Sequence, residues 1–298
     1  TFRPTCLAPE TMIAGDLSHD TPMLIVGLKQ LMDFFPNVIA DNLSQQGIPA
    51  SHTILDLPSL HERNFNVPMG IATMMEQPKL RAELVAQLKP LVGTAERIGF
   101  PAILGVDKAI DVKEDLERRL GRPVFEIPSL TPSIPGIRLH RILTSAIAKA
   151  GGRVFAGMEA IGAKSDAGRV TAVYTETAAR PHPHRAQNYV LATGGILGGG
   201  IITNSVGEVK EVIFDLPVTA PEKQYDWFHQ DFLDKRGHPI YRSGLSVNAG
   251  FQPVNGGDKP VYENLYAAGT TLAHSEVIRE RSFEGVALAT GYAVAQKL

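Results

Sequence analysis

Asn188-Tyr-Val-Leu-Ala-Thr-Gly-Gly195 is the stretch of this sequence that decides its fold, together with Glu263-Asn-Leu-Tyr-Ala-Ala-Gly-Thr270. Each is a short apolar run that ends in small residues and glycine. Such runs are typical of buried strands that stop beneath a flat ligand, because the ligand then contacts backbone and no side chain intervenes. The two stretches together predict a flavin pocket.

The composition excludes several classes of protein. The 298 residues are 44% hydrophobic and 20% charged, which is ordinary for globular proteins and enough for one large domain or two smaller ones. A formal net charge of −2 provides no broad positive field for nucleic acid or an anionic membrane surface. Cys6 is the only cysteine, which excludes a disulfide framework, a thiolate zinc site and a cysteine-ligated iron–sulfur cluster within this chain and suits a reducing compartment.

The sequence also lacks an obvious membrane or targeting signal. Its longest apolar runs, such as residues 22–28 and 189–197, are far shorter than the roughly 20 residues that span a bilayer. We therefore expect membrane contact only through partners. The sequence starts at Thr1 without an initiator methionine or a visible targeting segment, so we expect that its true N-terminus is missing.

A proline-rich segment, residues 121–136, separates two parts of the sequence that differ in their pattern of predicted strands and helices. Each proline fixes φ and removes a backbone donor, so no helix is expected to run through it. We interpret it as a hinge between a small α/β lobe, residues 1–127, and a second domain, residues 128–298. The lobe alternates predicted strands and helices. The strands are predicted at 23–27, 51–57 and 102–106, and the helices at 28–46, 77–93 and 109–120.

The second domain shows a more diagnostic order of elements. A helix over 137–150 precedes short strands at 153–157, 160–165, 169–176 and 187–192, with Asp166-Ala-Gly168 as a tight turn. A helix, a three-stranded meander and a strand ending in Ala-Thr-Gly-Gly are typical of flavoproteins with two dinucleotide-binding domains. The predicted fold class is therefore an α/β fragment of such a flavoprotein. A substrate or cap segment is expected around 201–255, and a flavin-contacting helix at the C-terminal end.

The whole chain resembles the B subunit of anaerobic glycerol-3-phosphate dehydrogenase. The resemblance is carried by Pro128-Ser-Leu-Thr-Pro-Ser-Ile-Pro-Gly-Ile-Arg-Leu139, Gly27-Leu-Lys-Gln-Leu-Met-Asp-Phe34, Leu191-Ala-Thr-Gly-Gly-Ile-Leu-Gly-Gly-Gly200 and Asn264-Leu-Tyr-Ala-Ala-Gly-Thr270. It implies a flavin-dependent subunit that oxidises sn-glycerol 3-phosphate, a small phosphate ester, to dihydroxyacetone phosphate and passes electrons to quinone. It implies FMN as the cofactor, with FAD as the alternative.

The resemblance also implies partners and a location. The partners are the catalytic A subunit, which holds flavin, and the iron–sulfur C subunit of the dehydrogenase complex. The location is cytoplasmic, with peripheral association with the inner membrane through those partners.

Two features of the sequence depart from this family. No Gly-x-Gly-x-x-Gly turn follows a strand and opens a helix, although such a turn normally holds a pyrophosphate. We therefore expect a fragment that lacks the N-terminal Rossmann segment and binds flavin poorly alone. The second departure is Arg279-Glu-Arg-Ser-Phe-Glu-Gly285, which stands where family members can carry a glycine-rich run. Its charges either pair with phosphate or form a solvated loop.

The flavin site is predicted from three segments. The cofactor-binding residues are Ala192, Thr193, Gly194, Gly195, Gly269, Thr270, Thr271, Glu284, Gly285 and Val286. The first seven leave room for the ring, and the last three open a helix whose N-terminus favours the anionic reduced flavin by about 0.3–1 kcal/mol. The alternative interpretations are a tight turn after a buried strand and an ordinary terminal helix.

The catalytic residues are predicted from the chemistry of alcohol oxidation. A base must take the hydroxyl proton, and His274 is the best placed histidine. Arg242 is the predicted clamp for an anionic substrate, because a guanidinium matches phosphate geometry. The alternatives are a surface histidine and a surface salt bridge, and His140 could face either the cofactor or solvent. His182 and His184 lack a nearby carboxylate or cysteine and are predicted to lie in an exposed hairpin loop, so no metal site is expected.

Two other functions remain open. One is a non-catalytic electron-relay or structural subunit of the same complex, because the sequence shows no clear acid–base constellation. The other is a flavin reductase of the fumarate-reductase or ketosteroid-dehydrogenase type, which shares the Ala-Thr-Gly-Gly strand. An aromatic cluster, Trp227-Phe228-His229-Gln-Asp-Phe232, would cover the flavin, contact another subunit or pack in the core.

Overall fold

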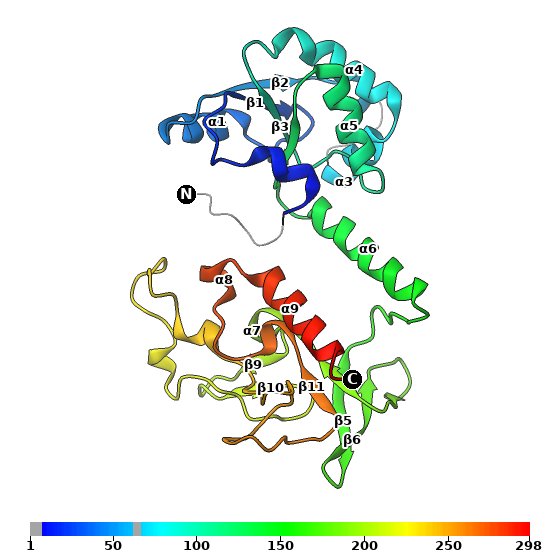
Figure 1. Ribbon diagram of the computed structural model, residues 1–298, viewed down its shortest axis with the longest axis vertical. Coiled ribbons are helices and arrows are strands. Elements are labelled where there is room, and N and C mark those ends of the chain that lie inside the picture. Colours follow the sequence, from blue (N-terminus) through cyan, green and yellow to red (C-terminus); the bar gives the residue numbers. More distant parts are fainter. Residues whose placement is uncertain (1–7, 62–66) are drawn as a thin grey trace. The chain divides into compact units, whose positions relative to one another are not determined.

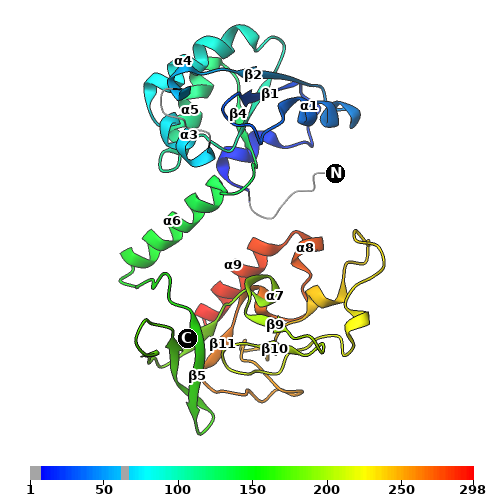
Figure 2. The ribbon, with the colours of Figure 1, turned by 180° about the vertical axis from the view of Figure 1, so that it is seen from behind.

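The computed structural model describes residues 8–61 and 67–298. Within these ranges the chain forms two compact units that divide between Val154 and Phe155. Figures 1 and 2 show the units from opposite sides. The first unit contains a parallel sheet with helices, and the second contains small sheets and the last long helix. The protein therefore has the mixed α/β fold that the sequence predicts.

The first unit is built around one parallel sheet. Its elements are η1 (Glu10–Gly15), β1 (Met23–Leu28), α1 (Pro36–Gln45), β2 (Ala50–Leu55), α2 (Pro58–His61), α3 (Pro68–Met75), α4 (Pro78–Leu88), η2 (Lys89–Leu91), β3 (Arg97–Pro101), α5 (Ala109–Leu120), β4 (Val124–Ile127) and α6 (Ile134–Lys149). The strand order is β2-β1-β3-β4, with every pairing parallel. All six residues of β1 are buried, as expected for a central strand covered on both faces.

Three predictions for this unit differ from the structure. α1 begins at Pro36 rather than at residue 28, because proline is favoured in the first turn of a helix, where its missing donor is not needed. The third strand is β3, so the predicted strand at 102–106 was wrong. β4 runs inside the segment predicted to be a hinge, since a strand tolerates the prolines that flank it better than a helix does.

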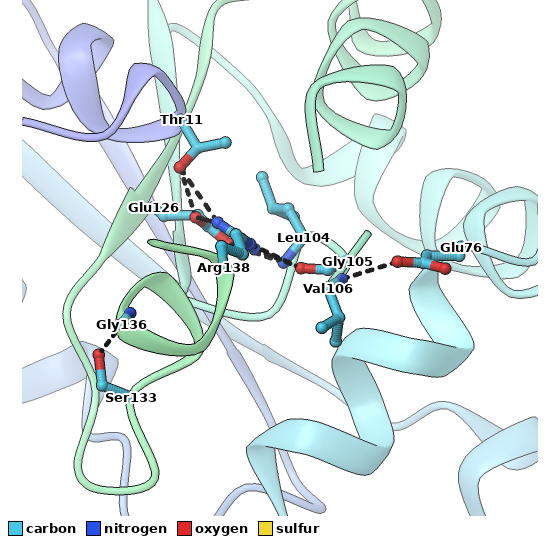
Figure 3. A network of polar contacts seen from close by, with 9 residues as sticks. All are labelled: Thr11, Glu76, Leu104, Gly105, Val106, Glu126, Ser133, Gly136 and Arg138. Carbon is cyan, nitrogen blue, oxygen red and sulfur yellow. Dashed lines mark hydrogen bonds and ion pairs between the residues drawn. The ribbon is translucent and has the colours of Figure 1, made fainter. Parts of the chain in front are cut away.

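A buried polar network ties α6 to the end of the sheet (Figure 3). The Glu126 carboxylate accepts hydrogen bonds from Thr11 Oγ1 at 2.6 Å, from the Leu104 backbone at 2.7 Å, and from Arg138 Nη1 at 2.6 Å and Nη2 at 2.8 Å. Arg138 Nε also donates to the Gly105 carbonyl at 2.8 Å. The Glu126 side chain is fully buried, and a buried charge requires this degree of pairing.

This network explains where the two units divide. The sequence analysis placed a boundary after residue 127, before α6. The Arg138 contacts instead join the first half of α6 to the sheet, and the contacts of the chain separate only after Val154. The compact units therefore divide after Val154. The division into a lobe 1–127 and a domain 128–298 is kept as a proposal about which residues share a function.

Asp115 on α5 makes the first unit sensitive to acid. Burial raises the pKa of this carboxyl, but hydrogen bonds from Arg81, Arg118 and Arg119 outweigh burial and lower the pKa to about 2. Because the pKa is lower in the folded chain, the stabilisation is complete above the ordinary pKa of 3.8 and is lost as the pH falls towards 2.

We expect the urea-unfolding free energy of the first unit to fall between about pH 4 and pH 2. The variant Asp115→Asn should be less stable at neutral pH and should show a shallower fall over that window. Urea titrations followed by circular dichroism at several pH values measure both quantities. An identical pH dependence in the variant would rule out this role for Asp115.

The second unit combines a meander, two small sheets and short helices. Its elements are β5 (Ala160–Asp166), β6 (Arg169–Thr175), β7 (His182–His184), β8 (Tyr189–Leu191), α7 (Gly195–Gly198), β9 (Ile201–Thr203), β10 (Val209–Glu211), η3 (Gln224–Asp226), η4 (Pro239–Arg242), β11 (Leu265–Ala267), η5 (Gly269–Thr271), α8 (Val277–Glu280) and α9 (Phe283–Ala295). The sheet pairings are β5-β6-β7, β8-β11 and β9-β10.

The meander confirms one sequence prediction and corrects another. The tight turn between β5 and β6 is present, with positive φ at Ala167 and Gly168, as a two-residue hairpin turn requires. Its third strand is β7, which pairs with β6, and residues 153–157 form no strand. His182 and His184 therefore lie in a strand rather than in a loop.

Candidate functional site

The two glycine-rich ends predicted from the sequence lie side by side. β8 and β11 pair in parallel, with Tyr189 opposite Leu265 and Leu191 opposite Ala267. The Ala268 backbone N–H then donates to the Leu191 carbonyl at 3.0 Å. Because the pairing is parallel, both strands end at the same edge. The turns that follow them, residues 192–195 and 269–271, are brought together there.

The two turns contact each other through their glycines. A Cβ added to Gly195 would lie 2.3 Å from the Thr270 carbonyl oxygen, and one added to Gly194 would lie 2.9 Å from Gly198 Cα. At these two positions the neighbouring chain fills the space of the missing side chain. Gly269 differs, since nothing lies within 4 Å of its Cβ direction. Its open side is the part of these turns best suited to face a ligand.

The first turn of α9 joins the same place. The Gly269 backbone N–H donates to Thr290 Oγ1 at 2.7 Å, and this hydroxyl donates to the Val286 carbonyl at 2.6 Å. Thr290 thus links the turn after β11 to Val286, which lies one turn earlier in α9. In Figures 1 and 2 α9 lies next to α7, which starts at Gly195. The first two predicted flavin segments therefore meet at one edge of the second unit, and the third is represented there by Val286.

Buried hydroxyls in this region lack partners. Among the described residues, Thr193 Oγ1, Ser243 Oγ and Thr271 Oγ1 are buried and make no hydrogen bond. Ser243 belongs to the same region because Leu245, two residues on, donates its backbone N–H to the Thr271 carbonyl at 2.8 Å. Orphaned buried polar atoms are rare. Open backbone at Gly269, with the unpaired Thr271 hydroxyl two residues on, fits a planar group that has a polar edge, such as a flavin ring.

The two predicted catalytic residues are neighbours beyond Thr271. The His274 backbone N–H donates to the Arg242 carbonyl at 2.9 Å. His274 is exposed and has a φ of 78°, a left-handed conformation that is uncommon outside glycine and is found at functional sites. Arg242 Nε lies 3.4 Å from the buried Glu276 carboxylate. The structure therefore places Arg242, at the end of η4, against His274, which follows the turn after β11.

Comparison with known proteins decides the family. The family model described as an FAD binding domain matches residues 2–282. Relatives named for the B subunit of anaerobic glycerol-3-phosphate dehydrogenase come from Halobacterium salinarum, with 33% identity over 98% of this chain and 70% of the relative, and from Yersinia pseudotuberculosis, with 30% identity over 99% and 70%. A third, from Pectobacterium carotovorum, has 33% identity over 100% and 70%.

The chain belongs to the family of B subunits of anaerobic glycerol-3-phosphate dehydrogenase. This confirms the resemblance seen in the sequence and places the chain among flavin-binding oxidoreductases. Because the relatives are named as one subunit of a dehydrogenase, partner subunits are implied. No solved structure gives a significant match. No helix in residues 8–61 and 67–298 is long and apolar enough to cross a membrane.

Other residues considered in the sequence belong to other elements of the chain. His140 is exposed on α6 in the first unit, and the neighbouring Arg138 pairs with Glu126. His184 Nε2 lies 2.9 Å from Thr175 Oγ1 within the meander. Across the described ranges no group of three potential metal ligands is found. Trp227 of the aromatic cluster is buried, whereas Phe228 and Phe232 are exposed, so core packing accounts for Trp227 only.

Sequence reasoning missed two buried side chains that organise the region. Asn264 accepts from the Val170 backbone at 2.8 Å and donates to the carbonyls of Val170 and Gln187 at 2.9 Å each, which fixes the meander next to β8. Glu276 is only 2% exposed and pairs with Arg242 and Arg279. A polar residue within the apolar run after Glu263 was the available signal for Asn264.

Proposed function

We propose that this chain is a flavin-dependent subunit that oxidises sn-glycerol 3-phosphate to dihydroxyacetone phosphate, with the electrons passing on to quinone. The observation that carries the proposal is the meeting of the turns after β8 and β11 beside the first turn of α9. Family membership supports the substrate, because the relatives are named for it.

Three segments of the chain would hold the flavin. They are Ala192, Thr193, Gly194 and Gly195, then Gly269, Thr270 and Thr271, and finally Glu284, Gly285 and Val286. A bound flavin supplies the acceptor for the hydride of the alcohol carbon. The matching family model is named for FAD, which favours FAD over the FMN expected from the sequence. Mass measurement of the released cofactor decides between them.

The neighbouring side chains are assigned to the substrate. Arg242 holds the phosphate group, because it is half-exposed and its guanidinium is anchored by a carboxylate. His274 takes the hydroxyl proton of the alcohol, since it is exposed and its backbone is bonded to that of Arg242. Arg242 belongs to the segment 201–255, which we propose as the substrate or cap segment, and His274 contacts that segment through the Arg242 carbonyl.

The assembly is proposed from the family alone. The partners would be the flavin-holding A subunit and the iron–sulfur C subunit. The complex would lie in the cytoplasm, peripherally at the inner membrane. Co-purification of this chain with both partners tests this arrangement, and recovery of the chain without either would contradict it.

Anaerobic titration with substrate tests the activity. A version of the chain that restores the expected N-terminal strand, glycine-rich turn and helix should be yellow, and sn-glycerol 3-phosphate should bleach its visible flavin absorption. His274→Gln should keep the colour and bleach about 10²- to 10⁴-fold more slowly, because general base catalysis contributes that much. Colour that does not bleach would support the relay role instead. Protein that folds but binds no flavin would refute both functions.

A further inference from the structure

A basic cleft opens in the second unit beside the proposed catalytic residues. It has a volume of about 490 Å³ and is lined by His229, Lys235, Arg236, Pro239, Arg242 and Arg279. Arg279 lies on α8, and Arg242 ends η4. Figures 1 and 2 both show α8 next to the yellow segment that contains η4. Cationic side chains from separate stretches of chain therefore converge on one small space.

A buried carboxylate orients two of these cations. Glu276 Oε2 lies 3.4 Å from the Nε atoms of both Arg242 and Arg279, whose side chains are 49% and 47% exposed. Glu276 itself is held in place, because its Oε1 accepts from the His238 backbone at 3.1 Å. A Cβ on Gly237 would clash with this carboxylate. Glu276 meets each guanidinium at Nε, and Arg242 Nη2 also lies 3.5 Å from the Arg236 carbonyl.

The lining keeps an excess of positive charge. Asp234 accepts from Arg236 Nε at 3.0 Å and Nη2 at 2.8 Å, so this pair is locally neutral. The single negative charge of Glu276 neutralises one of the two positive charges of Arg242 and Arg279. Lys235 has no carboxylate partner among the described residues. The cleft is therefore suited to a small dianion rather than to a neutral or cationic ligand.

We propose that this cleft binds a phosphate monoester, with Arg242 and Arg279 held as a pair by Glu276 and with Lys235 adding charge at the rim. A dianionic phosphate presents several acceptor oxygens that match two guanidinium edges. The chain offers two sources of such a group, the substrate and the phosphate of FMN. The choice of sn-glycerol 3-phosphate rests on the proposed function, whereas the affinity for phosphate does not.

Calorimetric titration of the purified protein with inorganic phosphate tests the cleft without flavin chemistry. Arg279→Gln should weaken phosphate binding about tenfold or more, because it removes a charged hydrogen-bonding partner. Lys235→Gln should weaken it about two- to fivefold, as for an exposed charge. Arg169→Gln is the matched control, because Arg169 is 51% exposed and is paired with Glu263 at 3.1 Å. Circular dichroism confirms that each variant is folded.

The outcomes separate this inference from the proposed function. Affinity that is lost in Arg279→Gln and Lys235→Gln but kept in Arg169→Gln supports the cleft, even if flavin bleaching fails. Competition by sn-glycerol 3-phosphate but not glycerol assigns the phosphate to the substrate, and competition by FMN but not riboflavin assigns it to the cofactor. No phosphate binding, or equal affinity in the three variants, overturns the inference while leaving the bleaching test valid.

Discussion

Gly195→Ala is expected to destabilise the second unit by about 2–4 kcal/mol and to abolish flavin binding. The added Cβ would lie 2.3 Å from the Thr270 carbonyl oxygen and 3.2 Å from its carbonyl carbon. Both atoms belong to the backbone, so neither can rotate away. The turns after β8 and β11 would separate, and the site formed by their meeting would be lost. Urea unfolding and flavin fluorescence titration measure the two effects.

Gly199→Ala is the matched control for this variant. Gly199 also has a positive φ, of 81°, but nothing lies within 4 Å of its Cβ direction. Its replacement carries only the left-handed strain of about 1 kcal/mol and should leave flavin binding in place. If both variants lost the same stability and the same affinity, contact between the two turns would not be what builds the site.

Arg138→Met is expected to destabilise the first unit by about 3–5 kcal/mol. The fully buried Glu126 carboxylate would lose the two charged hydrogen bonds from Arg138 and keep only those from Thr11 and Leu104. Leaving one buried charge without its partner destabilises a protein far more than replacing both charged groups with neutral ones. The double variant Glu126→Gln/Arg138→Met should therefore recover part of the stability.

The same helix provides the control for this prediction. Arg141 also pairs with a carboxylate, Asp107, but the two side chains are 47% and 64% exposed. Arg141→Met should change stability by at most about 1 kcal/mol, as for other surface pairs. Equal effects at Arg138 and Arg141 in urea unfolding would show that the buried network does not hold α6 to the sheet.

The sequence predicted the parts of the fold that local pattern determines. β1 was found because its residues form a continuous apolar run, and α5 because Asp111 stands in its first turn and Gly121 follows it with a left-handed φ of 69°. α6 was predicted as a helix, but its attachment to the first unit was not. That attachment depends on tertiary contacts, among them the buried ion pair between Arg138 and Glu126 and the burial of Ile134 in the first core, which no periodicity reveals.

The candidate site was predictable only in part. The strands β8 and β11 were expected to end together, because both are apolar runs that stop at glycine, and they do pair. The basic cleft was not predicted, apart from Arg242 and the charged segment that starts at Arg279. Its other cationic side chains lie in the loop between η3 and η4, which has no periodic pattern. The contact of the Glu276 carboxylate with Gly237 joins residues far apart in sequence, so the sequence alone does not indicate it.

Amide chemical shifts of the isotopically labelled protein, recorded with and without flavin, test most directly whether the ring lies at the turns after β8 and β11. Aromatic ring currents act over short distances, so the largest changes should fall on Gly194, Gly269 and Thr271. The amide of Gly168, a residue in the turn between β5 and β6 whose carbonyl accepts from Glu263 at the start of the β11 segment, should not shift. Flavin binding that shifts other amides and leaves all three turn residues unchanged would contradict the proposed site.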